Sequence, residues 1–406
     1  MKKQMKKQMK KQLAAVSLLA GTAIGSGMIS LPIVLANFGV VGSLALLAFF
    51  SLITYISAMI RCDLNINSRA DSNLRDVGLL FGGRIPAAIG DLSLKVLSFS
   101  LLSAYIFGGA SIVRESLQID TSSFTSVAVV FTCAILLLFL FLSGIVVKIN
   151  KHMFIVLFSI ILVGIVCLTM CSKTDSIPTN IEGFFHMKGW SAVLPVVFTS
   201  FGFQGSLHSM TKFVNNDKKL IKRACLFGSL VPVFVYSLWT TCILTVVFNS
   251  DPASFNKMLV APIEVSELIR ILSAITKVDF IQHAAWVISL LAISTSIIGV
   301  GLSLVEVLKK DFERFTKDKV GLHVASVFVM IIPSAIIAIM IPNAFIRVLN
   351  FAGIILAIIA IVLPVFLYSK MKRRLEFADI CKLSILSIVG FAIIFFGIYD
   401  IIIPGY

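Results

Sequence analysis

Charged residues are scarce in this chain of 406 residues. Asp, Glu, Lys and Arg make up 14% of it and apolar residues 58%, whereas soluble domains contain about 25% charged residues. No polar stretch between apolar runs exceeds roughly 35 residues, which is too short for an independent domain. The composition therefore excludes a soluble globular protein and predicts a chain embedded in a membrane.

Cysteine pairs and catalytic signatures are also missing. The seven cysteines are scattered, and none of them forms a Cys-x-x-Cys pair, so neither a disulfide framework nor a metal site is expected. The chain has no P-loop, no His-Glu-x-x-His and no nucleophile elbow. We therefore expect no enzyme and no cofactor.

Long apolar runs dominate the chain instead. A helical span needs about 20 apolar residues to cross the bilayer. Eleven such runs lie near residues 13–35, 39–60, 89–113, 125–147, 153–171, 190–211, 224–248, 281–307, 321–341, 344–368 and 383–403. The sequence thus predicts an all-α polytopic membrane protein with eleven transmembrane helices, whose first partner is the lipid bilayer.

The net charge of +15 follows the expected topology. With the N-terminus placed inside, most Lys and Arg residues fall in the N-terminal tail and in the loops on its side of the membrane. The positive-inside rule then places the N-terminus in the cytoplasm and the C-terminus outside. A nucleic-acid partner is not expected, and the oligomeric state stays open.

Two glycine-rich interruptions stand out within the apolar runs. The first run contains Gly21, Gly25 and Gly27, and the sixth contains Gly202 and Gly205. Each glycine in a helix interior costs about 1 kcal/mol relative to Ala, so we expect both helices to unwind there. Unwound backbone at this depth is viable only where it is buried in protein or lines a cavity. Two such breaks are typical of the midplane binding site of a secondary transporter.

The breaks divide the chain into two halves of five spans. Because five spans separate the first from the sixth, the halves have opposite topology, as in a five-plus-five inverted repeat. We expect four parts: a basic cytoplasmic tail (1–12), a first repeat of spans one to five (13–171), a second repeat of spans six to ten (190–368), and an appended eleventh span (383–403).

The first break predicts a site for a carboxylate. A half-helix that begins after an unwound turn presents free N–H groups and a positive dipole end, and these groups accept an anion. Gly25, Ser26 and Gly27 are small enough to let a substrate carboxylate reach the backbone. The alternative is close helix packing by small residues.

The second break combines Phe201, Gly202, Phe203 and Gln204. Carbonyl groups freed near residues 200–203 would accept a substrate ammonium, and Gln204 would orient the substrate. The two phenyl rings would wall a pocket for its side chain. Alternatively, these rings face lipid.

Polar residues elsewhere in the spans extend these hypotheses. Tyr105 needs a partner in the third span, either a substrate carboxylate or a neighbouring helix. Asp91 and Lys95, spaced i,i+4, are expected to neutralise each other, with a gating role as the alternative. His208 follows the second break, and its imidazole titrates near neutrality; it would carry a proton or bridge helices.

The eighth span contains three consecutive hydroxyl residues, Ser294 to Ser296. Thr295 and Ser296 would bind a hard cation together with backbone carbonyls of Gly21 and Ile24 in the first break, since such ions prefer oxygen ligands. In the alternative, these hydroxyls bond to carbonyls of their own helix.

Several of these motifs resemble a known family, the hydroxy/aromatic amino acid permeases, which include bacterial tryptophan and tyrosine permeases. The similar segments are Gly21 to Pro32 in the first span, Ala104-Tyr105 with Gly108-Gly109 in the third, Leu194 to Phe203 in the sixth, and Leu291 to Ser296 followed by Gly299 in the eighth.

The resemblance implies the inverted-repeat fold of the amino acid–polyamine–organocation superfamily in a bacterial cytoplasmic (inner) membrane. It also implies symport of tyrosine or tryptophan, usually with a proton. The pattern Ala292-x-x-Thr295-Ser296 is similar to the sodium site of sodium-coupled relatives, so both H⁺ and Na⁺ stay open. Family members often carry His in place of Gln204, Pro in place of His208 and Glu in place of Thr240.

Two other functions remain compatible with the sequence. A symporter of the same class would carry serine, threonine or a branched apolar amino acid. A channel or a non-transporting nutrient receptor belongs to a different class.

Overall fold

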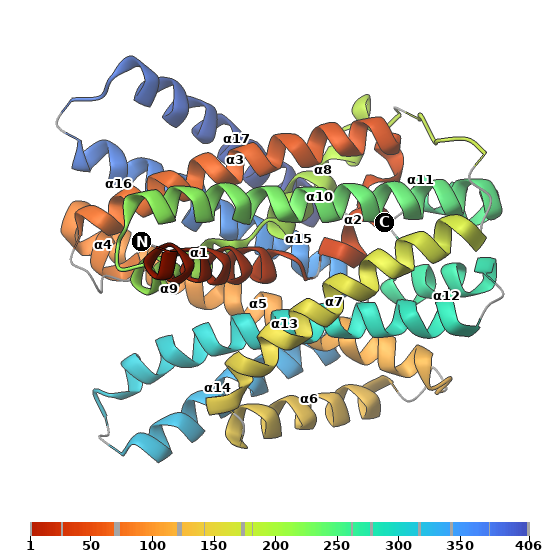
Figure 1. The fold of residues 1–406 in the computed structure, drawn as a ribbon, viewed down its shortest axis with the longest axis horizontal. Helices are drawn as coiled ribbons and strands as arrows, with labels where there is room; N and C mark the ends of the chain where they lie inside the picture. Colours follow the sequence, from red (N-terminus) through yellow and green to blue (C-terminus); the bar gives the residue numbers. More distant parts are fainter. Residues whose placement is uncertain are drawn as a thin grey trace.

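A computed structural model describes most of the chain, and every regular element in the described residues is a helix (Figure 1). The described residues are 2–25, 27–68, 74–119, 124–141, 143–171, 175–180, 182–260, 263–276, 279–315, 318–341, 344–372 and 374–403. The prediction of an all-α protein is confirmed.

The helices follow the predicted apolar runs along the chain. The first half contains α1 (Lys2–Ala23), α2 (Gly27–Leu35), η1 (Ala36–Phe38), α3 (Gly39–Asn67), α4 (Leu74–Phe81), α5 (Arg84–Ser116), α6 (Phe124–Phe141) and α7 (Ser143–Cys171). The second half contains η3 (Glu182–Phe184), α8 (Met187–Ser200), η4 (Phe203–Ser206), α9 (Leu207–Phe213), α10 (Lys218–Ser250), α11 (Pro252–Val260), α12 (Val265–Thr276), α13 (Asp279–Phe312), α14 (Lys319–Met340), α15 (Ala344–Ala357), η5 (Ile358–Val362), α16 (Leu363–Met371) and α17 (Phe377–Ile402).

Eight stretches of the described chain are long and apolar enough to cross a membrane. They are Gly27–Asn67, Arg84–Ser116, Phe124–Phe141, Lys218–Ser250, Ala285–Phe312, Lys319–Met340, Phe345–Met371 and Phe377–Ile402, and Ile155–Met170 is a shorter apolar helix. The chain is thus a polytopic membrane protein, while the count of eleven spans stays a prediction.

Both predicted helix breaks are confirmed. In the first span, α1 ends at Ala23 and α2 begins at Gly27. In the sixth, α8 ends at Ser200, and the 3₁₀ turn η4 leads into α9. The local cost of glycine in a helix explains why the regular winding stops at these two places.

Helices at equivalent positions of the two halves lie side by side. Span one packs on span six through α2 and α8, span two on span seven through α3 and α10, span three on span eight through α5 and α13, and span four on span nine through α6 and α14. Figure 1 shows α3 and α10 running next to each other along the bundle. A two-fold relation between the halves would produce such pairs.

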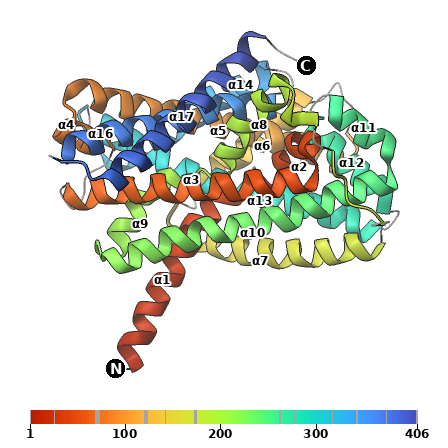
Figure 2. The same ribbon diagram turned by 90° about the horizontal axis from the view of Figure 1, so that it is seen from above.

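Three boundaries differ from the sequence prediction. The basic tail is helical and continuous with α1, because Lys, Gln and Met are good helix formers; its N-terminal part extends away from the bundle (Figure 2). The fourth run was expected to continue to residue 147, yet α7 already begins at Ser143. Arg61 directly follows the predicted second span (39–60) and was therefore expected in a loop, yet it lies inside α3 and is 5% exposed.

Charged and amphipathic segments at the helix ends contact the bundle. Lys95 forms the expected ion pair with Asp91 at 2.8 Å, and it also reaches Asp311 of α13 at 2.6 Å. The amphipathic helix α12 packs on α13 and α5 and buries Leu268 and Leu272.

The last helix is attached to the core by a carboxylate. Asp400 of α17 accepts a hydrogen bond from Asn350 Nδ2 of α15 at 2.5 Å and one from Ser191 Oγ of α8 at 3.1 Å. Since Asn350 is 1% exposed, water cannot replace a lost partner at its amide. The appended span is therefore tied to the same helix, α8, that leads into the second break.

We expect Asp400→Ala to lower the free energy of unfolding by about 1–3 kcal/mol, because it leaves the buried amide of Asn350 unsatisfied. Denaturation of the purified protein in detergent measures the change. Glu313→Ala removes an exposed carboxylate and is the control. Equal stability of the two variants would contradict the anchoring role of Asp400.

Candidate functional site

The first break is closely surrounded by side chains of other helices. A Cβ atom at Gly25 would lie 1.7 Å from Ser296 Oγ of α13. A Cβ atom at Gly27 would lie 2.5 Å from Tyr236 Oη and 2.7 Å from Ser200 Cβ. Only glycine fits at these two positions. Ser26 lies outside the described residues.

The second break begins where α8 ends against α10 and α15. The amide of Phe201 donates to the carbonyl of Phe198 at 3.1 Å, and that of Gly202 donates to Thr199 at 2.9 Å. The carbonyl of Ser200 instead faces Tyr236 of α10, whose hydroxyl lies 2.9 Å away. The break thus directs a backbone acceptor at a side chain from another helix.

One phenol joins the two breaks. Tyr236 is fully buried, and its hydroxyl lies 2.6 Å from the carbonyl of Ala23 and 2.9 Å from that of Ser200. A hydroxyl carries a single hydrogen, so the two carbonyls share this donor. The last carbonyl of α1 and the last carbonyl of α8 therefore converge on one point of the core.

Further contacts hold the broken helices in place. Trp239 Nε1 of α10 donates to the carbonyl of Met28 at 2.6 Å, just after the first break. The hydroxyls of Thr22 and Ser206 lie 2.8 Å apart and connect α1 to η4 directly. Because Tyr236 and Trp239 are one turn apart, a single face of α10 contacts backbone of both broken spans.

The two phenylalanines predicted for the second break lie in different clusters. Phe201 is fully buried in the main core, and its ring meets that of Tyr236 edge-on at 5.5 Å. Phe203 is also fully buried, but it packs in a separate cluster with Leu19, Cys62 and neighbouring apolar residues. Neither ring faces lipid, and only Phe201 lies at the point where the breaks converge.

Gln204 and Tyr105 are buried near this point as well. Gln204 donates through Nε2 to Ser57 Oγ at 3.4 Å, and its Oε1 has no hydrogen-bond partner in the described part of the protein. Tyr105 of α5 is 4% exposed and lies close enough to Tyr236 for an electrostatic interaction. His208 lies in α9, and its side chain is outside what the structure describes.

The predicted cation residues of α13 lie beside the first break. Ser296 is 2% exposed, faces Gly25, and its Oγ has no hydrogen-bond partner in the described residues. Thr295 Oγ1 donates to the carbonyl of Ala292 at 2.9 Å, the self-bonded arrangement that was the alternative. Gly21 and Ile24 are buried at the end of α1, where the amide of Ile24 donates to Ala20 at 2.8 Å.

A buried arginine contacts an irregular turn of the tenth span. The turn is η5, a π-helix between α15 and α16. Arg61 Nη1 donates to its Ile359 carbonyl at 3.3 Å, and Ser57 Oγ donates to that of Ala360. Ionisable residues inside a membrane protein are often functional, and through Ser57 this group is connected to Gln204.

Space is distributed unevenly around the site. Gly25, Gly27 and Gly202 are closely enclosed, whereas a Cβ atom at Gly205 or Gly299 would meet no atom within 4 Å. Gly205 is exposed. The second break is therefore accessible on the side of η4, toward α9.

Sequence reasoning missed three side chains of this site. Tyr236 and Trp239 lie on the seventh span, where only the position after the tryptophan was considered. Arg61 was assigned to a loop. The one available signal was the polar spacing on α10, since Ser229, Tyr236 and Thr240 recur on one face of an otherwise apolar helix.

The whole fold resembles that of a known membrane transporter. A mutant of the manganese transporter of Eremococcus coleocola superposes with a TM-score of 0.62 at 14% sequence identity, covering 95% of this chain and 85% of that one. With the two broken helices, this likeness places the protein in the class of polytopic helical membrane proteins with a transporter fold.

The sequence comparison is more specific. The model of the tryptophan/tyrosine permease family matches residues 8–404, so the chain belongs to this family. It is 29% identical over 358 residues to tyrosine-specific transport system 1 of Haemophilus influenzae, covering 88% of this chain and 87% of the relative. It is 26% identical over 365 residues to a tryptophan-specific transport protein of Pseudomonas aeruginosa, covering 88% and 85%.

Removing the shared phenol tests this geometry. We expect Tyr236→Phe to lower the free energy of unfolding by about 1–3 kcal/mol, because two buried carbonyls lose their donor. Tyr399→Phe on α17 removes a half-buried phenol and serves as the control in the same denaturation experiment. If both variants unfold together with the wild type, the hydroxyl does not link the breaks.

Proposed function

We propose that the protein is a secondary active symporter that carries an aromatic amino acid, tyrosine or tryptophan, into the bacterial cell across the cytoplasmic membrane. Membership of the tryptophan/tyrosine permease family and the names of its relatives support the substrate class. The convergence of two helix breaks at Tyr236 carries the proposal, because it brings backbone groups of both spans to one buried point.

The two breaks would bind the two charged ends of the substrate. The amide groups of Gly25 and Gly27 lie just before and at the N-terminal end of α2, where the helix dipole favours a carboxylate. The carbonyls of Ala23 and Ser200 are acceptors for an ammonium, which can take the place of the Tyr236 hydroxyl. Phe201 and Tyr105 supply aromatic surface beside them. In this assignment Phe203 supports the helix from behind rather than touching substrate.

Access would alternate between the two sides of the membrane. A Cβ atom at Gly205, in η4 next to α9, would meet no atom within 4 Å, whereas Trp239 would close the opposite side through its hydrogen bond to Met28. We assign the open side to the cytoplasm, with the N-terminus inside and the C-terminus outside, from the positive-inside rule. Rocking of spans one, two, six and seven against the remaining helices would open the other side.

The first functional test is uptake of radiolabelled tyrosine and tryptophan by cells that express the protein. Gly27→Ala should abolish uptake without preventing membrane insertion, because the added methyl would lie 2.5 Å from Tyr236 Oη. Gly299→Ala adds the same methyl where no atom lies within 4 Å and should transport normally.

Three outcomes of this assay would contradict the proposed site, substrate class or transport activity. Full uptake by Gly27→Ala would show that the substrate binds elsewhere. Competition by unlabelled serine, threonine or leucine, but not by tryptophan, would change the substrate class. Saturable binding without accumulation above the outside concentration would indicate a channel or a receptor.

The coupling ion is the second open property. Of the buried polar residues in the described chain, those around the breaks are hydroxyls, amides and the guanidinium of Arg61, and none is a carboxylate. Ser296 Oγ is buried beside the first break with no partner there. We therefore favour Na⁺ over H⁺ as the coupling ion. Ser296 Oγ would bind it together with Ala292, Thr295 and the carbonyls of Gly21 and Ile24.

Proteoliposomes with an imposed sodium or pH gradient distinguish the two ions. We expect a sodium gradient to drive uptake, and Ser296→Ala to raise the sodium concentration for half-maximal uptake about tenfold, as expected for one lost charge-assisted contact. Ser294→Ala, a half-buried neighbour, is the matched control. Uptake driven by a pH gradient alone, with Ser296→Ala unaffected, would establish proton coupling.

A further inference from the structure

A second pocket lies away from the helix breaks, at the end of the bundle where α3, α10, α16 and α17 meet. Its volume is about 230 Å³. Its lining combines apolar, aromatic and charged side chains: Tyr55, Ile56, Met59, Ile60, Asp63, Lys222, Tyr368, Asp379, Lys382 and Leu383. The transport site proposed above uses none of these residues.

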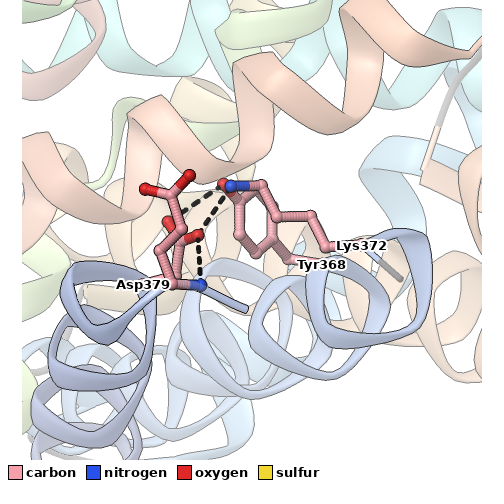
Figure 3. A network of polar contacts seen from close by, with 4 residues as sticks. Tyr368, Lys372 and Asp379 are labelled. Atoms are coloured by element: carbon pink, nitrogen blue, oxygen red, sulfur yellow. Dashed lines mark hydrogen bonds and ion pairs between the residues drawn. The ribbon is translucent and has the colours of Figure 1, made fainter. Parts of the chain in front are cut away.

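One carboxylate of this pocket is already paired within the protein. Asp379 accepts from Lys372 Nζ at 2.6 Å, and the Tyr368 hydroxyl lies 3.5 Å from its other oxygen (Figure 3). The hydrogen bond that Lys372 donates to Asp379 raises the pKa of Lys372, which stays protonated. This pair contributes no net charge to the pocket.

Three other charges of the pocket have no such partner. Among the residues that the structure describes, the side chains of Asp63, Lys222 and Lys382 form no hydrogen bond and no ion pair. The ammonium groups of Lys222 and Lys382 and the carboxylate of Asp63 thus line a single hollow, in which Lys382 attracts Asp63 without forming an ion pair. Such a set is complementary to a molecule that carries both an anionic and a cationic group.

The pocket lining changes from charged to apolar side chains along the axis of α3. Asp63 lies about one turn from the end of α3, and Lys222 and Lys382 lie in the first two turns of α10 and α17. Tyr55 is eight residues before Asp63, or roughly 12 Å deeper along the helix. Leu52 and Phe49 continue the same face of α3 and are 56% and 43% exposed. A charged end therefore leads into an apolar wall that is open to the bilayer.

We propose that this pocket binds phosphatidylethanolamine, a phospholipid whose headgroup carries a phosphate and a primary ammonium. Lys222 and Lys382 bind the phosphate, and Asp63 accepts hydrogen bonds from the ammonium. The acyl chains follow the apolar face of α3. A free amino acid has the same two charges, but they radiate from one carbon and do not match a lining that separates charged from apolar groups along the helix axis.

The test measures lipid binding to the purified full-length protein by native mass spectrometry, with dioleoyl phosphatidylethanolamine, phosphatidylcholine and phosphatidylglycerol. Phosphatidylcholine keeps both headgroup charges but has no N–H donor. We expect phosphatidylethanolamine to bind about tenfold more tightly than phosphatidylcholine, since a hydrogen bond to a charged group is lost. Asp63→Asn should remove this preference.

Two lysine variants separate the phosphate contact from general surface charge. Lys382→Gln should weaken binding of all three lipids severalfold, because each carries the phosphate. Lys219→Gln, on the same turn of α10 as Lys222 but outside the pocket lining, should bind as the wild type does. The lysine variants keep the test decisive if Asp63→Asn fails to fold.

Several results would overturn the proposal. Equal affinity for phosphatidylethanolamine and phosphatidylcholine, or a preference that survives in Asp63→Asn, would exclude recognition of the ammonium. Equal weakening by Lys219→Gln and Lys382→Gln would leave only non-specific charge attraction. Displacement of the lipid by free tyrosine would make the pocket a second amino acid site instead.

Discussion

Backbone groups in the middle of a membrane need partners, and this requirement organises the core of the protein. A helix break frees carbonyls and amides at a depth where no lipid can bind them. Here the carbonyls of Ala23 and Ser200 share the hydroxyl of Tyr236. This arrangement depends on the position of α10, which carries Tyr236, and on Gly27, where a Cβ atom would lie 2.5 Å from the Tyr236 hydroxyl. In the proposed transport cycle, the ammonium group of the substrate would bind to the same two carbonyls.

The structural likeness and the family membership support different statements about this protein. The likeness to the manganese transporter is at 14% identity and concerns the fold alone. Membership of the tryptophan/tyrosine permease family rests on nearly the whole chain. The structure adds the chemistry of the two helix breaks, where hydroxyl, amide and aromatic side chains surround backbone carbonyl and amide groups. The proposed substrate, a zwitterionic amino acid, carries charges that are complementary to these groups.

The sequence predicted the helix breaks, which depend on the free-energy cost of glycine within a single helix. It did not predict which face of a helix points into the core, because that depends on packing against other helices. Glycine spacing located both breaks, because each glycine weakens its own helix wherever that helix lies. Which face of α10 points inward depends on packing against several helices, so Tyr236 could not be identified as the shared donor. Arg61 was misplaced for a related reason: a charge near the end of an apolar run reads as a loop until its carbonyl partner in η5 is known.

The π-helical turn η5 also determines how the tenth span ends. A turn of this kind holds one residue more than an α-helical turn, and each residue of an α-helix advances the side chains by about 100°. All residues after Val362 are therefore turned by that angle relative to an uninterrupted helix. Tyr368, which follows this turn, lies with its hydroxyl 3.5 Å from Asp379 Oδ1. Deleting one residue from Ile358–Val362 would keep the span intact but would direct the side chains of its last two turns toward different neighbours. The extra residue of the π-helical turn therefore determines which groups the end of this span contacts.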